Sequence, residues 1–397
     1  MLSLLVFFVH GYRWGERIRG DERRFLELAK RFKEAGLRLY VVEHAPSMQK
    51  AYYGKPMYYS LEIPSLYGYS NYTSLMRMLY TLSFVIRVCL KFRRRIDIIY
   101  AHNQDVSNLV PALIAKAIIR KPLIIVLHSL QDFNFSFKEL LKMYRGSILD
   151  SLLILSQRVI GRLILKLADM VFTVSHTVRK EAEKSLNIKR IVVTGNGVDT
   201  NKFRPLKLEK KYHAVFCGRI DFAQKGIDML LKAWKTIVSN LPSAKLLLIG
   251  GFQDKHNQGL LKKFVEVLKL RDNIIITGFL PDEKLVELLN ESNIFILISR
   301  FEGFGLSVLE AMSCGLPCIV SDIPVFKELH DGIAIFSSQE STKDLVNEVF
   351  KILSDRTRYE RLSFFSRIHA LKFSWQVIAD KEVTIIRTIA KRYSKLR

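Results

Sequence analysis

The sequence has few cysteines and no apolar run that is long enough to cross a bilayer. Its four cysteines lack the paired Cys and His spacing of a zinc site, so we interpret them as free thiols of a reducing compartment. The most apolar segments, residues 75–90 and 148–167, are interrupted by Arg or Asp, which argues against a transmembrane helix. Residues 2–9 have neither the preceding basic residue nor the cleavage site of a signal peptide. These absences predict a cytoplasmic globular protein.

Acidic residues are also scarce, since the 397 residues include 62 Lys and Arg but only 38 Asp and Glu, a net charge of +24. Residues 1–200 carry most of the excess, with a balance of +15. Such a charge favours an anionic partner, but it does not distinguish nucleic acid, anionic lipid headgroups and phosphorylated small molecules. With 49% hydrophobic residues, the chain can build the cores of two or three domains.

Short β-branched runs alternate with amphipathic helical stretches, and no internal repeat is present, a pattern typical of parallel strands joined by helices. We therefore predict an α/β protein with two doubly wound, Rossmann-like domains, residues 1–200 and 201–374, joined by a turn-rich, basic linker. Ligands bind beyond the carboxyl ends of parallel strands, so two such sheets facing each other across a cleft would hold the chemistry there. The predicted strands are residues 2–9, 37–42, 97–101, 123–128, 170–174 and 191–194, then 213–217, 245–249, 273–277, 294–298, 317–320 and 333–336.

A glycine loop follows the strand predicted at 294–298. Gly303 and Gly305 allow backbone N–H groups to approach a ligand closely, and a helix predicted to begin near Leu306 turns its positive end toward the same place. The loop therefore predicts a site for an anion.

Two glutamates lie on either side of this predicted helix start. Glu302 precedes the helix and can accept hydrogen bonds from hydroxyls at the loop. Glu310 falls about one turn inside it, where its carboxylate can accept from two vicinal hydroxyls such as those of a ribose. A structural loop with a glutamate that complements the helix dipole explains these residues equally well on their own.

A second pair of residues favours a ligand site over the purely structural explanation. Arg219 follows the strand predicted at 213–217, and Lys225 follows six residues later, before a predicted helix. A guanidinium and an ammonium that leave one strand end are suited to two oxygens of a diphosphate, although either alone would be an ordinary surface cation.

In these motifs the chain resembles the retaining glycosyltransferases of family four, which have the GT-B fold. The resemblance covers nearly the whole chain and rests on the order and spacing of several short motifs. They are Asn-Gly-Val-Asp at 196–199 with Phe-Arg-Pro at 203–205, Gly218-Arg219 with Lys225-Gly226, and the Glu-x₇-Glu spacing from Glu302 to Glu310.

The resemblance implies roles for individual residues. In that family the C-terminal domain holds a nucleotide-diphosphate sugar and the N-terminal domain holds the acceptor. The residues so implied are Glu302 and His128 for the chemistry, Arg219, Lys225, Gly305 and Leu306 for the donor diphosphate, and Gly303, Phe304 and Glu310 for the sugar and ribose.

Two positions in the first domain depend on the resemblance alone. His128 ends the strand predicted at 123–128, and a lone histidine there is more often structural. The family commonly has a Gly-Gly pair near Gly20 for close approach to the diphosphate, whereas here Asp21 follows that glycine.

The sequence contains no Asp-x-Asp, the pair that chelates a divalent ion on a sugar nucleotide in other transferases. We therefore expect no metal and no other cofactor. Arg219, Lys225 and the helix dipole near Leu306 would then stabilise the leaving diphosphate.

Two segments of the first domain suggest that the protein binds a membrane surface. Residues 52–72 hold seven of the chain's 15 tyrosines, and residues 75–95 mix apolar residues with six arginines and lysines. A loop whose rings pack back on the domain, and a core-packed helix with a solvated end, explain them equally well. The helix after Trp375, residues 375–397, is predicted to return to the first domain.

The leading hypothesis is a retaining, metal-independent hexosyltransferase that uses a UDP-sugar or GDP-sugar and a glycan or lipid-linked glycan acceptor. Its predicted location is cytoplasmic, peripheral on the inner face of the cell membrane. One alternative keeps the fold and changes the chemistry to nucleotide-sugar epimerisation or hydrolysis. Another is a non-catalytic basic module that binds anionic lipid or nucleic acid, although the dispersed cations and the lack of nucleic-acid-binding motifs argue against nucleic acid.

Overall fold

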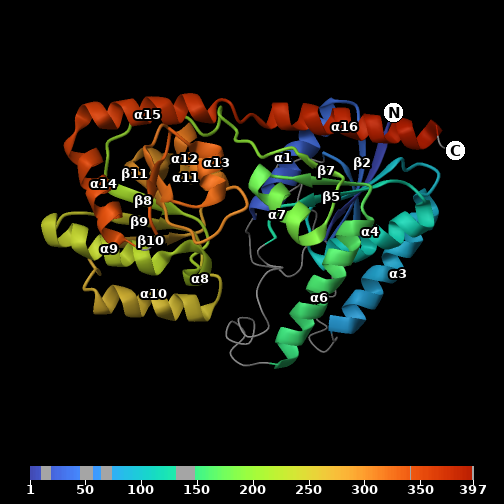
Figure 1. Ribbon diagram of the computed structural model, residues 1–397, viewed down its shortest axis with the longest axis horizontal. Coiled ribbons are helices and arrows are strands. Elements are labelled where there is room, and N and C mark those ends of the chain that lie inside the picture. Colours follow the sequence, from blue (N-terminus) through green and yellow to red (C-terminus); the bar gives the residue numbers. More distant parts are fainter. Residues whose placement is uncertain (10–18, 45–56, 64–73, 131–147, 340, 396–397) are drawn as a thin grey trace. The chain divides into compact units, whose positions relative to one another are not determined.

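The computed structural model describes residues 1–9, 19–44, 57–63, 74–130, 148–339 and 341–395 (Figure 1). The chain forms two compact units. Unit 1 comprises Met1–Gly195 and Trp375–Arg397, and unit 2 comprises Asn196–Ser374. Each unit is a parallel sheet covered by helices, so the predicted α/β fold class is confirmed.

Unit 1 is built on a seven-stranded sheet in the order β3-β2-β1-β4-β5-β6-β7, and every neighbouring pair is parallel. Its central strands are apolar and fully buried, as expected for a sheet with helices on both faces. The strands are β1 (Ser3–Phe8), β2 (Arg38–His44), β3 (Tyr59–Ile63), β4 (Ile98–Ala101), β5 (Leu123–Leu127), β6 (Met170–Thr173) and β7 (Ile191–Val193).

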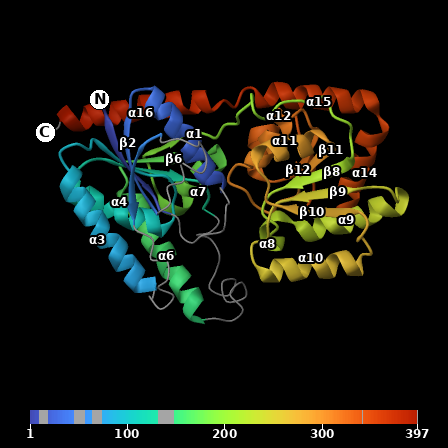
Figure 2. The same cartoon turned by 180° about the vertical axis from the view of Figure 1, so that it is seen from behind.

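Two groups of helices cover this sheet. Helix α1 packs against α16 on one face, and α4 lies between α3 and α6 on the other (Figures 1 and 2). The helices are α1 (Gly20–Glu34), α3 (Ser74–Phe92), α4 (Val106–Ile119), α6 (Ile148–Leu167), α7 (His176–Leu186) and α16 (Trp375–Lys395). Among the residues that the structure describes, no helix has both the length and the apolar character needed to cross a membrane.

Unit 2 is built on a six-stranded parallel sheet in the order β10-β9-β8-β11-β12-β13. The strands are β8 (Tyr212–Cys217), β9 (Leu246–Ile249), β10 (Ile274–Gly278), β11 (Ser292–Leu297), β12 (Cys318–Ser321) and β13 (Ile335–Ser337). The helices are α8 (Phe222–Lys225), α9 (Ile227–Asn240), α10 (Lys255–Val267), α11 (Asp282–Asn290), α12 (Leu306–Ser313), α13 (Pro324–His330), α14 (Thr342–Ser354) and α15 (Arg356–Ala370).

The sheet order in each unit reverses beside its first strand, between β1 and β4 in unit 1 and between β8 and β11 in unit 2. This reversal opens a crevice at the carboxyl ends of the two strands, which is where doubly wound sheets bind ligands.

The edge strand β3 was not predicted, because the tyrosine-rich stretch was interpreted as a turn-rich loop. Tyr59 stacks on Tyr40 of β2 with ring centroids 5.3 Å apart, and the buried Tyr58 donates a hydrogen bond from its hydroxyl to Glu43. These rings therefore pack on the unit. The other five tyrosines of residues 52–72 lie outside the described residues.

A buried ion pair fastens α16 to unit 1. The Arg24 guanidinium on α1 contacts the Glu382 carboxylate on α16, and both side chains are almost completely buried. Tyr100 at β4 donates to the second oxygen of Glu382 at 3.0 Å, and Arg24 also donates to the Thr194 hydroxyl at 2.9 Å. The buried charges of Arg24 and Glu382 thus compensate each other within one network.

Replacing Glu382 with Ala is expected to lower the free energy of unfolding by about 3–5 kcal/mol, because it leaves a buried guanidinium without its counter-charge. Asp380→Ala is the matched control, since it removes an equal charge from the exposed side of the same helix. Urea denaturation of both variants measures the difference. Equal losses in the two variants would contradict the importance of the buried pair.

Candidate functional site

The strand, glycine loop and helix predicted around residue 303 are present in unit 2. Strand β11 ends at Leu297, and α12 begins at Leu306 after Gly305, whose φ of +87° lies in the left-handed region. A Cβ at Gly305 would lie 2.6 Å from the Phe326 ring, so the position has no room for a side chain. The loop therefore presents backbone, and not side chains, at the start of α12.

Lys225 and Glu302 meet at this loop. The Lys225 ammonium lies 2.5 Å from Oε1 of Glu302, and the Ser299 hydroxyl donates to the same oxygen at 2.7 Å. Both charged side chains are mostly buried, with exposed fractions of 15% and 9%. Since an ammonium has three N–H donors, Lys225 can hold Glu302 and still donate to a second anion.

A close backbone contact explains why two residues 77 positions apart come together. Gly226, next to Lys225, has a φ of +62°, and a Cβ there would lie 2.0 Å from the carbonyl oxygen of Ile298 at the end of β11. The N–H of Arg300 donates to the carbonyl of Gln224 at 2.7 Å. The turn between α8 and α9 thus lies directly on the strand end that carries Glu302.

Arg219 lies beside the same turn and is oriented by its neighbours. Its Nη2 donates to Gln224 at 2.6 Å and to Asp221 at 3.2 Å. Asp221 also accepts hydrogen bonds from the backbone at the start of α8. The guanidinium is 44% exposed and remains accessible to a ligand.

The remaining residues predicted for unit 2 are Glu310 in α12 and Gly303 and Phe304 in the loop before it. Glu310 lies in the second turn of α12 and is 8% exposed. The Phe304 side chain is buried and packs edge-on against Phe373, so only its backbone is positioned to contact a ligand. Gly303 lies in the loop between Glu302 and Phe304.

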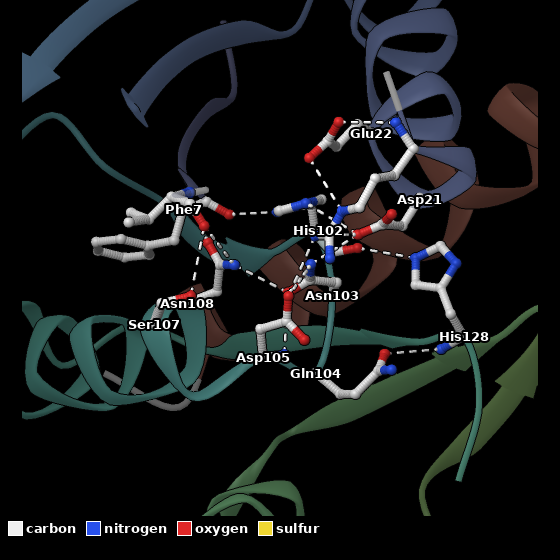
Figure 3. A network of polar contacts seen from close by, with 12 residues as sticks. Phe7, Asp21, Glu22, His102, Asn103, Gln104, Asp105, Ser107, Asn108 and His128 are labelled. Atoms are coloured by element: carbon white, nitrogen blue, oxygen red, sulfur yellow. Dashed lines mark hydrogen bonds and ion pairs between the residues drawn. The ribbon is translucent and has the colours of Figure 1, made fainter. Parts of the chain in front are cut away.

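The switch point of unit 1 carries a polar network around the start of α1 (Figure 3). Asp21 accepts hydrogen bonds from Asn103 at 2.8 Å and from Arg19 at 2.9 Å. Arg19 also contacts Glu22 and Asp105, and although burial opposes it, these carboxylates raise the pKa of Arg19. Burial alone would raise the pKa of Asp21, but the neighbouring His102 ring and Arg19 hold it well below its usual value.

This network bears on the predicted close approach at Gly20. Gly20 opens α1 and is exposed, yet the next residue places the Asp21 carboxylate in the first turn of the helix. A carboxylate there interacts favourably with the helix dipole and repels a phosphate. A contact between Gly20 and a diphosphate therefore stays a prediction and has to overcome the repulsion from Asp21.

Two histidines follow neighbouring strands of the same unit. His102 after β4 is buried, and its Nδ1 donates to the carbonyl of Phe7 at 2.9 Å. His128 after β5 is half-buried, and its Nε2 donates to the carbonyl of His102 at 3.0 Å (Figure 3). Withdrawal from solvent lowers the pKa of His128 to about 4, despite the opposing effect of Asp21. His128 is therefore neutral at physiological pH, with its proton on Nε2 and an unprotonated Nδ1.

The two units match two family models that adjoin along the chain. The model for glycosyl transferases group 1 matches residues 198–367, and the model for glycosyltransferase family 4 matches residues 18–202. The chain belongs to the group 1, family 4 glycosyltransferases that these two models describe. Two of the motifs that carry the resemblance, Gly218-Arg219 with Lys225-Gly226 and the segment that begins at Glu302, lie in the strand-end cluster of unit 2.

Among curated proteins, the mannosylfructose-phosphate synthase of Agrobacterium fabrum is 26% identical to this glycosyltransferase over 228 residues. The match covers 51% of this chain and 48% of that protein, so the chain spans about half the length of this relative.

Solved structures match over nearly the full length. Anabaena HepE in complex with UDP and glucose has a TM-score of 0.76 at 18% identity, covering 98% of this chain and 100% of that one. The sucrose-phosphate synthase of Thermosynechococcus elongatus has a TM-score of 0.77 at 18% identity, covering 98% and 99%. These similarities show that the fold is GT-B.

Sequence reasoning did not find three residues that orient the charged groups of unit 2. Ser299, Asp221 and Gln224 hold Glu302 and Arg219 by direct hydrogen bonds. Their types are common at strand ends and helix caps, so only their closeness to the charged residues could have indicated them. No group of three His, Cys, Asp or Glu side chains suited to a metal ion occurs in the described parts of the chain.

The pKa of His128 predicts a change of stability with pH. Because the folded pKa of about 4 lies below the usual 6.5, the unfolded chain binds a proton between pH 6.5 and 4 that the folded chain does not. The free energy of unfolding should therefore fall as the pH drops through this window, by about 2 kcal/mol between pH 7.5 and 5 from this residue. Urea denaturation at both pH values should show that His128→Gln reduces the loss, whereas His256→Gln, at an exposed position, leaves it unchanged. A loss that His128→Gln does not alter would contradict the shifted pKa.

Proposed function

We propose that this protein transfers a glycosyl group from a nucleoside-diphosphate sugar to an acceptor hydroxyl, with retention at the anomeric carbon. The observation that carries the proposal is the cluster at the carboxyl ends of β8 and β11, where Arg219, Lys225 and Glu302 lie around the start of α12. Two cations and a helix N-terminus suit a diphosphate, and a carboxylate beside them suits the hydroxyls of a sugar.

The residues of this cluster have separate roles in the proposed reaction. Arg219 and Lys225, with the N–H groups of Gly305 and Leu306, stabilise negative charge on the departing diphosphate. Glu302, held by Lys225 and Ser299, accepts hydrogen bonds from the transferred sugar, and the loop backbone at Gly303 and Phe304 contacts the same sugar. Glu310 binds the ribose. The bond between the anomeric carbon and the diphosphate breaks, and the anomeric carbon becomes oxocarbenium-like. Because no residue of the motifs is an obvious nucleophile, the acceptor hydroxyl attacks on the face that the phosphate leaves, and the leaving phosphate assists this attack.

His128 is proposed to contact the reacting sugar as a neutral group. Its Nε2 proton is already donated to the His102 carbonyl, which leaves Nδ1 as an acceptor for a sugar hydroxyl. A neutral imidazole adds hydrogen bonding without adding positive charge next to an oxocarbenium-like centre.

The donor and acceptor are proposed as classes of compound. The HepE structure is a complex with UDP and glucose, and the Agrobacterium relative is named as a mannosylfructose-phosphate synthase, which supports a hexose as the transferred group and UDP as its carrier. GDP is proposed as the alternative carrier. We propose a glycan or lipid-linked glycan as acceptor, at the cytoplasmic face of the membrane, because the basic excess lies in residues 1–200. Epimerisation or hydrolysis of the nucleotide sugar is the alternative that the same cluster would support.

Calorimetric titration with UDP and GDP at 150 mM salt tests the proposal. Arg219→Ala should weaken binding of the preferred nucleotide about 10- to 100-fold through the loss of charge-assisted hydrogen bonds. Arg271→Ala, at an exposed position of unit 2, is the control and should have no effect. Absence of nucleotide binding together with salt-sensitive binding to a polynucleotide would favour the basic module, and release of free sugar without transfer to any acceptor would favour a hydrolase.

The two glutamates should differ in their kinetic effects. Glu302→Ala is expected to lower kcat by about 10²- to 10³-fold, because that carboxylate contacts the reacting sugar. Glu310→Ala is expected mainly to raise the KM for the donor, because the ribose does not change during the reaction. Steady-state kinetics with the preferred donor measures both, and equal effects of the two variants on kcat and KM would contradict the division.

Transfer should continue in excess chelator. The sequence lacks Asp-x-Asp, and Arg219 and Lys225 are the cations proposed to neutralise the diphosphate. Turnover in about 5 mM EDTA, which removes divalent ions, should match the untreated rate within about twofold. Loss of turnover in EDTA that Mg²⁺ or Mn²⁺ restores would show that a metal is required.

A further inference from the structure

The two helical layers of unit 1 differ sharply in charge. Residues 74–95, 106–121 and 148–167, which cover α3, α4 and α6, contain 12 Lys and Arg and a single acidic residue. The helices on the other face, α1 and α16, contain six acidic residues. Asp150, near the start of α6, is the only acidic residue within these three helices, and Lys116 is paired with Asp169 after α6. A layer with so few acids and so many cations attracts anions.

An exposed apolar ridge runs along α6 within this layer. Val159, Ile160, Leu163 and Leu167 are 50%, 41%, 57% and 53% exposed. Their spacing places them along one side of the helix. Ile164 and Leu165 are buried, so α6 carries apolar residues on its inner and outer sides. Isolated exposed apolar residues are ordinary, but four within nine residues indicate a surface that a partner covers.

Helix α3 repeats this combination of apolar and basic residues. Ile86 and Leu90 are 40% and 55% exposed, and the exposed Arg87 and Lys91 each follow one of them directly. On α6 the exposed Lys166 lies next to Leu167 in the same way. Long basic side chains beside exposed aliphatic ones can reach phosphate groups while the aliphatic groups enter an apolar phase.

We propose that the outer faces of α3 and α6 dock unit 1 on an anionic lipid bilayer. The ridge enters the boundary between headgroups and acyl chains, and the cations bind lipid phosphates. Nucleic acid would use the cations but leave the aliphatic ridge in water, and a protein partner of matching charge would need an acidic surface. No helix among the described residues meets the requirements for spanning, so the contact is peripheral. The proposal is independent of the transfer reaction, because lipid binding requires neither donor nor acceptor.

Co-sedimentation with lipid vesicles tests the proposal without any substrate. The vesicles are phosphatidylcholine alone or phosphatidylcholine with about 30% phosphatidylglycerol, which is roughly the anionic fraction of a charged leaflet. The protein should bind the anionic vesicles at low salt and be released as the salt rises. Replacing Arg93, Arg94 and Arg95 with Ser should weaken partitioning about a hundredfold, since each cation near the surface contributes about a fivefold factor. Replacing Lys262, Lys263 and Arg271 of unit 2 with Ser removes the same charge and should change partitioning by less than about twofold.

The ridge is tested separately from the charge. Leu163→Ser should weaken binding to anionic vesicles at least about fivefold, whereas Val267→Ser, at a 71% exposed position of α10, should not. Thermal unfolding checks that each variant remains folded, which these exposed positions favour.

Three results would overturn the proposal. They are equal binding to neutral and anionic vesicles, equal loss from the unit 1 and unit 2 charge variants, and no effect of Leu163→Ser. Binding of a polynucleotide that is insensitive to Leu163→Ser, with no vesicle binding, would assign the basic layer to nucleic acid.

Discussion

The ion pair between Arg24 and Glu382 is the interaction on which the organisation of the chain depends. Placing a guanidinium and a carboxylate in a core is unfavourable unless each finds the other, and here they come from helices near opposite ends of the sequence. Tyr100 and Thr194 satisfy further hydrogen bonds of the pair, so β4 and the residue after β7 join the same network. The helical cover of unit 1 therefore includes α16, and unit 2 is enclosed in sequence between Gly195 and Trp375.

The parallel sheets determine where polar groups gather. Charged and polar residues gather at strand ends in both units, while the central strands β1, β4, β5 and β9 are largely apolar. In unit 2 the cluster is basic around Arg219 and Lys225, and the Lys225 ammonium holds the Glu302 carboxylate. In unit 1 it is acidic around Asp21 and Asp105, with one guanidinium held by carboxylates. The same topology thus produces two clusters of opposite electrostatic character.

Much of the fold followed from the sequence, because parallel strands buried on both faces leave continuous apolar runs. The twelve predicted strands all correspond to observed ones. β3 was missed because its edge position needs only one apolar face, and residues such as Ser60 and Glu62 interrupt the run. The start of α12 was predictable from Gly305, whereas the contact between Lys225 and Glu302 was not. It depends on the packing of Gly226 against Ile298, which no local pattern records.

The enclosure of one unit by the two segments of the other affects how the protein is made. All of unit 2 has been synthesised by residue 374, while unit 1 still lacks α16. The unit that comes second in the sequence can thus finish folding first, and a nascent chain that stops before Trp375 leaves Arg24 without its carboxylate. Such a chain would display unpaired charge and an uncovered α1, features that quality-control proteases act on. The burial of Arg24 therefore depends on a residue that is translated after all of unit 2.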